Sequence, residues 1–220
     1  MIYCIIKPVK DTDFTHLDAV QGKAEQRNEP YTMIRRMSSG SFDDEMRQKR
    51  EILLILHDIR SIHNVGSIFR TAEGFGVKKI YLSGYTPSPD NGLPHVRKKI
   101  AYQLHKTALG AEKMVQNEYS NDVIELIKNL KKSNNKIIGL EQDPRAIKLP
   151  DLRKGSTLTQ NQKIALLLGE EVHGITPELR DLCDELVEIP MFGKKESFNI
   201  SVATGIALYE LTLQQPDFRQ

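Results

Sequence analysis

One stretch decides the fold of this chain: ILLILHDIRSIHNVGSIFRTAEGFGVKKIYLSG, residues 52–84. It begins with a continuous apolar run, 52–56, which is typical of a strand buried on both faces of a parallel sheet. A helix capped by Asn64 is expected next, because apolar side chains recur at helical spacing until Gly76, a residue suited to a left-handed helix end. With a second strand expected at 77–84, the stretch predicts a strand–helix–strand unit.

The chain downstream continues this alternation. Further strands are expected at 136–141, 163–169 and 186–190, and further helices at 121–135, 176–183 and 199–215. Such alternation predicts an α/β fold in which helices cover a mostly parallel sheet. Residues 1–50 have little apolar periodicity after an opening strand, so we expect them to form an N-terminal arm. Residues 51–220 then form the domain that carries the activity.

Composition places the chain among water-soluble proteins of the cytoplasm. It has 220 residues, of which 39% are hydrophobic and 27% charged, enough for one sizeable α/β domain with an appendage. No run approaches the roughly 18 apolar residues that a membrane span needs, and the N-terminus lacks the features of a signal peptide. Cys4 and Cys183 lack metal-ligand spacing and are expected to be reduced, and the six histidines show no zinc spacing. We therefore expect no membrane anchor and no metal.

One segment, 94–113, is strongly basic although the net charge is only +2. Its acidic residue Glu112 stands against five cations: Arg97, Lys98, Lys99, Lys106 and Lys113. A basic patch of this kind is typical of a surface that meets RNA phosphates. An ordinary solvated helix face accounts for the same pattern equally well.

The helix expected after the first strand carries one well-placed arginine. Gly66, Arg70 and Glu73 lie at helical spacing on a face roughly opposite the apolar stripe. We expect Arg70 in the first two turns, where the helix dipole is positive, so that with Asn64 it forms a phosphate-binding site. A surface arginine paired with Glu73 is the alternative.

Two glycine-bearing loops follow strands in the C-terminal third. GEEVHGIT, 169–176, allows the backbone to approach a ligand and places Glu171 between two glycines. IPMFGKKESFNIS, 189–201, brings Ser197 and Asn199 to a helix start, either as simple caps or as the mouth of a site. The sequence contains no dinucleotide-binding, phosphate-loop or nucleophile-elbow motif. It therefore lacks the motifs that a redox, kinase or hydrolase function would need.

Three segments together resemble the motifs of the SpoU (TrmH-like) branch of the SPOUT RNA methyltransferases. They are NVGSIFRTAEGFGV (64–77), LLLGEEVHGIT (166–176) and IPMFGKKESFNISVATG (189–205), and the resemblance covers roughly 51–213. It implies a C-terminal trefoil knot, a homodimer and S-adenosylmethionine as cofactor, with S-adenosylhomocysteine as product. The implied reaction is methylation of a ribose 2′-hydroxyl in tRNA or rRNA.

The resemblance also assigns residues. The catalytic set it implies is Asn64, Arg70, Glu171, Ser197 and Asn199. The cofactor set, largely through backbone groups, is Leu140, Gly169, Ile189, Phe198 and Asn199. With Arg70, the basic segment supplies the RNA-binding set: Arg97, Lys98, Lys99 and Lys106.

Arg70 poses a chemical question, because the family assigns the role of general base to the arginine of the first motif. A guanidinium is effectively always protonated, so we expect Arg70 to orient and stabilise the attacking oxygen while an RNA phosphate or Glu171 takes the proton. Two alternatives to an RNA methyltransferase stay open: a catalytically inactive knotted RNA-binding protein, and an α/β enzyme acting on a small nucleotide. Many relatives carry a separate RNA-binding domain first, and 1–50 is too short and polar to be one.

Overall fold

A parallel sheet lies at the centre of the computed structural model, which describes residues 50–88, 93–152, 158 and 162–213. Within these residues the sheet has seven strands in the order β3-β2-β1-β6-β4-β7-β5, and every ladder between them is parallel. The strands are β1 (Ile52–His57), β2 (Lys79–Ser83), β3 (Gln116–Ser120), β4 (Asn135–Leu140), β5 (Ile147–Lys148), β6 (Lys163–Leu168) and β7 (Glu185–Glu188). The predicted α/β fold with a mostly parallel sheet is therefore confirmed.

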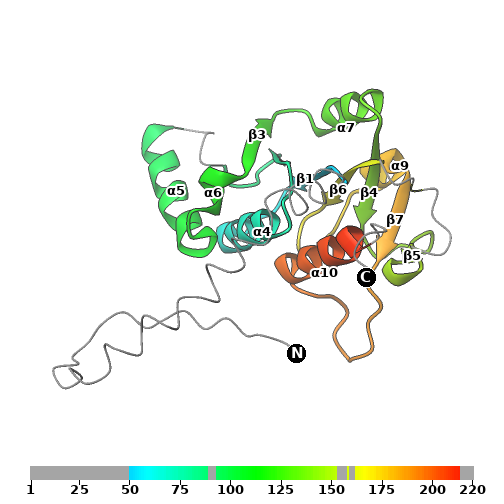
Figure 1. The fold of residues 1–220 in the computed structure, drawn as a ribbon. Helices are drawn as coiled ribbons and strands as arrows, with labels where there is room; N and C mark the ends of the chain where they lie inside the picture. Colours follow the sequence, from blue (N-terminus) through cyan, green and yellow to red (C-terminus); the bar gives the residue numbers. More distant parts are fainter. Residues whose placement is uncertain (1–49, 89–92, 153–157, 159–161, 214–220) are drawn as a thin grey trace, which may run out of the picture. The chain divides into compact units, whose positions relative to one another are not determined.

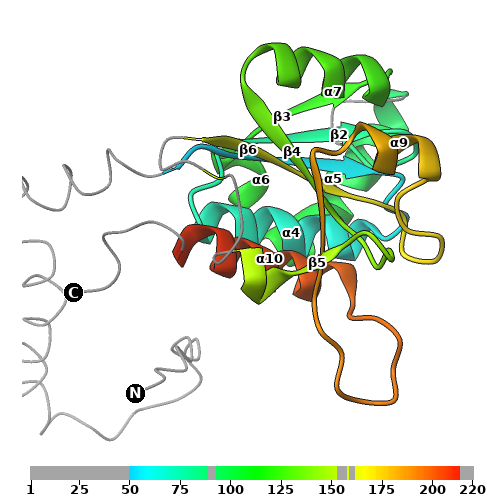
Figure 2. The ribbon, with the colours of Figure 1, turned by 90° about the vertical axis from the view of Figure 1, so that its right-hand side faces the viewer.

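Helices cover both faces of this sheet (Figures 1 and 2). They are α4 (Ile62–Gly74), α5 (Pro94–Ala108), α6 (Ala111–Met114), α7 (Val123–Lys132), α9 (Pro177–Leu182) and α10 (Ile200–Leu213), with a short 3₁₀ turn, η2 (Leu149–Asp151). Figure 2 shows α7 and α9 above the sheet and α4 and α10 below it. Among the described residues, no helix combines the length and apolar character needed to cross a membrane.

The central strand β1 shows why a continuous apolar run was needed. Successive side chains of a strand point to opposite faces, so alternate residues of β1 enter different cores. Leu54 packs with the α4 side chain Phe69, whereas Ile55 packs on the other face with Ile127 of α7. All four are fully buried.

The helix α4 begins earlier than predicted. Ser61 is its N-cap, and the Ser61 hydroxyl accepts a hydrogen bond from the Asn64 backbone N–H. Asn64 therefore lies inside the first turn, so the prediction that it caps the helix is wrong. Ser61 caps the helix because its backbone is extended while its side chain reaches the backbone N–H of the third helical residue. The predicted left-handed glycine at the other end is confirmed, with φ of 64° at Gly76.

Two edge strands, β3 and β5, and two helices, α5 and α6, were not among the elements expected from periodicity. The strand β3 has the polar sequence QNEYS, and β5 has only two residues, both exposed. Neither has the apolar pattern of a buried strand, because each lies at an edge of the sheet. The basic segment does form a helix, α5, followed by α6.

Candidate functional site

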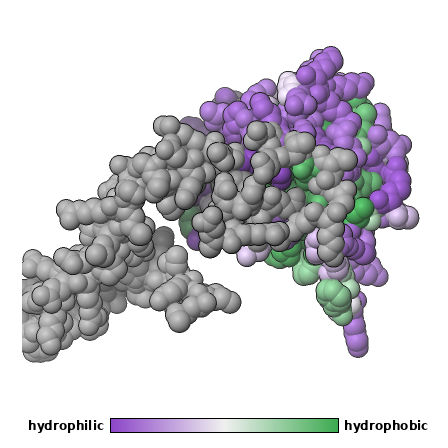
Figure 3. All heavy atoms as spheres, turned by 45° about the vertical axis from the view of Figure 1, so that its right-hand side comes forward, coloured by the Kyte–Doolittle hydropathy of each residue, from purple (hydrophilic) through white to green (hydrophobic). Residues whose placement is uncertain are grey.

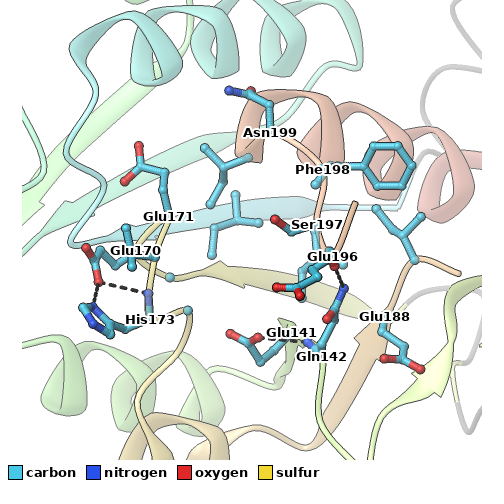
Figure 4. Close-up of a pocket in the computed structure, with 18 of the residues that line it drawn as sticks. Glu141, Gln142, Glu170, Glu171, His173, Glu188, Glu196, Ser197, Phe198 and Asn199 are labelled. Atoms are coloured by element: carbon cyan, nitrogen blue, oxygen red, sulfur yellow. Dashed lines mark hydrogen bonds and ion pairs between the residues drawn. The ribbon is translucent and has the colours of Figure 1, made fainter. Parts of the chain in front are cut away.

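A pocket of about 500 Å³ lies where three neighbouring strands of the sheet end. The strands β6, β4 and β7 are adjacent and parallel, so the loops that follow Leu168, Leu140 and Glu188 meet at one edge. Crevices of this kind, beyond the carboxyl ends of parallel strands, are where α/β proteins bind ligands. Figure 4 shows Glu170, Glu171 and His173 on one side of the opening and Gln142, Glu196 and Ser197 on the other.

The loop after β6 is a tight turn closed by its own backbone. Glu170 and Gly174 exchange two backbone hydrogen bonds, of 3.2 and 2.9 Å. A Cβ on Gly169 would lie 2.4 Å from the carbonyl carbon of Gly174, and Gly174 itself has a φ of 67°. Both glycines are needed for this turn, which exposes backbone groups to the pocket.

Glu171 connects this loop to the start of α4. Its carboxylate accepts hydrogen bonds from the backbone N–H groups of Arg60 (3.0 Å) and Ser61 (3.2 Å) and from the Asn64 side-chain amide (3.0 Å). Burial raises the pKa of Glu171, but these hydrogen bonds outweigh burial and leave the pKa below its ordinary value. Glu171 is therefore ionised at neutral pH.

Asn64 extends the network to the third motif. Because its amide nitrogen donates to Glu171, its oxygen is free to accept a hydrogen bond from the Asn199 amide, at 3.1 Å. The Asn199 oxygen in turn accepts from the backbone N–H of Ser201, at 2.9 Å, and so caps α10. One hydrogen-bonded chain thus joins the three sequence motifs.

A second acidic side chain, Glu170, is almost fully buried beside this network. One carboxylate oxygen lies 2.7 Å from the Arg60 guanidinium, and the other accepts a bond from the His173 backbone N–H and lies 2.5 Å from the His173 ring nitrogen Nδ1. Burial raises the pKa of Glu170, whereas His173 and Arg60 lower it, and the net result is a lowered pKa. The ion pair with Glu170 holds the Arg60 side chain next to the pocket lining.

The lining of the pocket is strongly acidic. Five of the described lining residues are glutamates and none is Lys or Arg: Glu141, Glu170, Glu171, Glu188 and Glu196. Arg60 and Lys148 pair with two of them from outside the lining. The pocket is therefore suited to a ligand that carries positive charge.

Most of the residues predicted from the sequence meet in this one place. The pocket is lined by Leu140, Gly169, Glu171, Ile189, Ser197, Phe198 and Asn199. Asn64 joins them through its bonds to Glu171 and Asn199. They come from four separate parts of the chain, at 64, 140, 169–171 and 189–199, which the fold brings together.

Arg70 does not lie in the lining, and its predicted position in the helix is wrong. It is the ninth of the 13 residues of α4, beyond the positive end of the helix, because Ser61 rather than Asn64 starts the helix. Its side chain is exposed. Gly66, predicted on the same outward face, is instead buried against Leu104 and Thr107 of α5.

The basic helix α5 presents its cations to solvent. Arg97, Lys98, Lys99 and Lys106 are all exposed, and no described carboxylate forms an ion pair with any of these four. Lys106 lies over the ring of exposed Tyr102, 4.7 Å from its centroid. This arrangement keeps the positive charge available to a partner.

The sequence reasoning missed several contributors to the site. Glu141 and Gln142 follow β4, and the Glu141 carboxylate accepts bonds from the backbone N–H groups of Ile175 (2.5 Å) and Gln142 (2.9 Å). Their position after a buried strand that neighbours β6 was the available signal. Arg60, His173 and Glu196 had no comparable signal in the sequence.

Of the two cysteines, Cys183 is described and is a free thiol. Burial raises its pKa to about 12, so the thiol is unreactive at neutral pH. Cys4 lies outside the described residues, as does the arm predicted at 1–50 apart from its last residue, Arg50.

Comparison with known proteins finds relatives in the family that the three sequence motifs resemble. A 23S rRNA (guanosine-2′-O-)-methyltransferase of Nitrosomonas europaea is 32% identical over 159 residues, which are 72% of this chain and 55% of that protein. A tRNA (guanosine(18)-2′-O)-methyltransferase of Aquifex aeolicus is 27% identical over 173 residues, 79% of this chain and 74% of that protein. The chain thus spans only about half the length of the first of these relatives.

Solved structures share the fold. A rRNA methyltransferase from Sinorhizobium meliloti, crystallised with AdoMet, superimposes with a TM-score of 0.62 at 23% identity, covering 74% of this chain and 56% of that one. The A. aeolicus TrmH/SpoU tRNA modifying enzyme gives 0.61 at 23% identity, covering 78% and 81%. The sequence model of the SpoU rRNA methylase family matches residues 51–209, which include all three motifs. The chain therefore belongs to this family.

Proposed function

We propose that this protein is an S-adenosylmethionine-dependent methyltransferase that modifies a ribose 2′-hydroxyl of tRNA or rRNA. The observation that carries the proposal is the hydrogen-bonded chain from Glu171 through Asn64 to Asn199, which joins the three family motifs at one pocket. Relatives that match most of the chain are named as guanosine-2′-O-methyltransferases of tRNA or rRNA. We propose residues 51–220 as the catalytic domain and 1–50 as an arm.

The pocket suits the proposed cofactor. Its backbone groups at Leu140, Gly169, Ile189 and Phe198, together with Asn199, would hold S-adenosylmethionine, which supplies an electrophilic methyl group on a cationic sulfonium. The turn at Gly169 leaves no room for a Cβ, and it brings backbone groups to the pocket surface. The excess of carboxylates complements a ligand with an ammonium and a sulfonium charge.

The chain's own residues provide positioning more than proton transfer. The lowered pKa of Glu171 and its three hydrogen bonds make it a poor proton acceptor, so we assign it to orienting Asn64 and Asn199. Ser197 lines the pocket together with Asn199. Placement of the attacking hydroxyl supplies much of the rate enhancement in a methyl transfer.

We propose that Arg70 orients the ribose and stabilises the developing negative charge on its oxygen. This assignment rests on its place in the first motif, and its guanidinium stays protonated throughout. The hydroxyl proton leaves as the O–CH₃ bond forms, when the oxygen is acidic enough for a weak acceptor such as an RNA phosphate or solvent to take it. Arg70→Lys retains the charge but loses the planar fork, so single-turnover methylation should slow by about tenfold or more. A near-normal rate would rule out an essential bidentate role.

The helix α5 is the proposed RNA-binding surface. Its four exposed cations, Arg97, Lys98, Lys99 and Lys106, would contact phosphates and release counterions. Binding should weaken steeply as salt rises, and the double substitution of Lys98 and Lys99 by Ala should reduce the slope of log affinity against log salt by about two.

A homodimer, a C-terminal trefoil knot and a cytoplasmic location complete the proposal. The dimer is supported by α10, where Val202, Ile206 and Tyr209 form an apolar stripe; Val202 and Tyr209 are 50% and 57% exposed. Figure 3 shows green, hydrophobic surface low on the described part of the molecule, and Figures 1 and 2 place both α10 and the loop before it there. The knot and the location rest on family membership.

The deciding experiment is methylation of total cellular RNA with a labelled methyl donor, followed by nucleoside mapping. Label should appear in one 2′-O-methylated nucleoside, and an Asn199→Ala variant should show much less. Calorimetry with S-adenosylhomocysteine is the companion measurement. RNA binding without any label transfer or cofactor binding would instead favour a catalytically inactive RNA-binding protein.

A further inference from the structure

An exposed tyrosine outside the pocket lining is connected to the pocket through Arg60, which pairs with the lining residue Glu170. Tyr85 follows β2, and 54% of its surface is accessible. The guanidinium of Arg60 lies over its ring, 5.8 Å from the centroid, within the range of a cation–π contact. The Arg60 side chain is itself 59% exposed. The two side chains thus present a cationic, planar group and an aromatic ring next to each other in solvent.

The backbone that carries Tyr85 is held firmly. Its N–H donates to the Asp58 carboxylate at 3.0 Å, and Asp58 has a φ of 59°, a left-handed conformation uncommon outside glycine. The adjacent Thr86 is buried; its hydroxyl donates to the Leu56 carbonyl and accepts from the Ile59 N–H, both at 3.0 Å. The loops after β1 and β2 are therefore tied together, and the exposed ring rests on a rigid base.

Arg60 connects this pair directly to the site. Its backbone N–H donates to Glu171, and its guanidinium pairs with the buried Glu170. The Tyr85 hydroxyl and the Glu170 carboxylate both raise the pKa of Arg60. One residue thus reaches the Glu171–Asn64 network with its backbone and the Tyr85 ring with its side chain.

We propose that Arg60 and Tyr85 form a stacking platform for an unpaired base of the substrate RNA, beside the ribose that is methylated. Exposed aromatic rings and guanidinium planes are the groups on which proteins stack single-stranded bases. The platform rests on the proposed function, because it assumes an RNA substrate at this pocket. It differs in role from α5, whose cations contact phosphates and read no base.

The test uses the full chain and two fluorescein-labelled probes of equal charge: a 12-nucleotide oligoadenylate and a 12-unit abasic ribose-phosphate strand. Three variants are compared: Tyr85→Ala removes the ring, Tyr85→Leu keeps apolar bulk without the ring, and Tyr85→Phe keeps the ring without the hydroxyl. The KM for total cellular RNA is measured in parallel. Thermal melting and affinity for S-adenosylhomocysteine check that each variant folds and keeps its pocket.

Tyr85→Ala and Tyr85→Leu should bind oligoadenylate about tenfold more weakly, because stacking is lost, and should bind the abasic strand as the wild type does. Tyr85→Phe should restore most of the oligoadenylate affinity. The salt slope should stay unchanged in all three, and the KM for RNA should rise in the first two.

Unchanged oligoadenylate affinity in Tyr85→Ala, or an equal loss for both probes, would overturn the platform. Measurements on the wild-type protein distinguish a failure of the platform from a failure of the proposed function. If it methylates RNA and binds S-adenosylhomocysteine while Tyr85→Ala matches it, only the platform is wrong. If the wild type binds neither cofactor nor RNA, both proposals fall.

Discussion

Glu171 shows how a single side chain holds the candidate site together. It lies in a turn that follows β6, yet its three hydrogen bonds go to residues around the start of α4. Two of the donors are backbone N–H groups at a helix start, where intrahelical partners are lacking. The carboxylate therefore stabilises the helix start and sets the amide orientation of Asn64 at once.

Replacing Glu171 should expose this double role. Glu171→Ala leaves the N–H groups of Arg60 and Ser61 without their acceptor, so the free energy of unfolding should fall by about 1–3 kcal/mol. Methylation should fall further, because Asn64 and Asn199 lose their orientation. Urea unfolding and single-turnover rates provide the measurements. Glu178→Ala, an exposed glutamate on α9, is the matched control and should change neither.

The pH dependence of stability should report the same carboxylate. Because its folded pKa lies below the ordinary value, its contribution is complete above about pH 4.3 and is lost as pH falls through the lowered pKa. The melting temperature of the wild type should therefore fall in acid. The melting temperature of the Glu171→Gln variant should fall less steeply over the same pH range. Parallel pH profiles for the two proteins would contradict this.

At the scale of elements, the contact between α4 and α5 depends on one glycine. Gly66 is buried, and a Cβ there would lie 2.1 Å from the Thr107 hydroxyl and 2.6 Å from the Leu104 carbonyl oxygen. The two helices approach closely only because that Cβ is missing. The same contact fixes the basic helix beside the helix that carries Asn64 and Arg70.

Two alanine substitutions on the same helix test this packing. Gly66→Ala should destabilise the protein by about 1–3 kcal/mol, because the added methyl group overpacks the α4–α5 contact. Gly74→Ala, where no atom lies within 4 Å of the new Cβ, should instead stabilise by about 0.4–1 kcal/mol. Denaturant unfolding measures both. Equal effects of the two substitutions would show that the close approach is not what Gly66 provides.

At the scale of the whole molecule, α10 is the feature that points beyond one chain. Its inner residues Ala207, Leu208 and Leu211 are fully buried, while Val202 and Tyr209 remain exposed. A helix that is apolar on all sides is usually buried on all sides. In the proposed homodimer, a second copy of the chain covers this outer stripe.

Charges placed on this stripe should dissociate the dimer. The double variant Val202→Glu and Tyr209→Glu should elute as a monomer, with its mass measured by light scattering. Tyr102→Glu, on the equally exposed surface of α5, should leave the dimer intact. A wild type that is monomeric at every concentration would refute the dimer.

The sequence by itself determined the fold class, the buried strands and the family. The run 52–56 is apolar at every position because β1 is covered on both faces, and that pattern is local to the chain. The pocket loops at 169–176 and 189–201 were predictable for a related reason. Neighbouring parallel strands end at the same edge, so loops that follow them must meet.

Only the tertiary structure decided which side chains work together. Asn64 meets Glu171 and Asn199 across separations of 107 and 135 residues, and no local pattern encodes such contacts. The same holds for Arg60, whose position depends on Glu170, Glu171 and Tyr85 together. Local periodicity reports which face of an element is buried, whereas hydrogen-bond partners and close approaches depend on what the fold brings against that face.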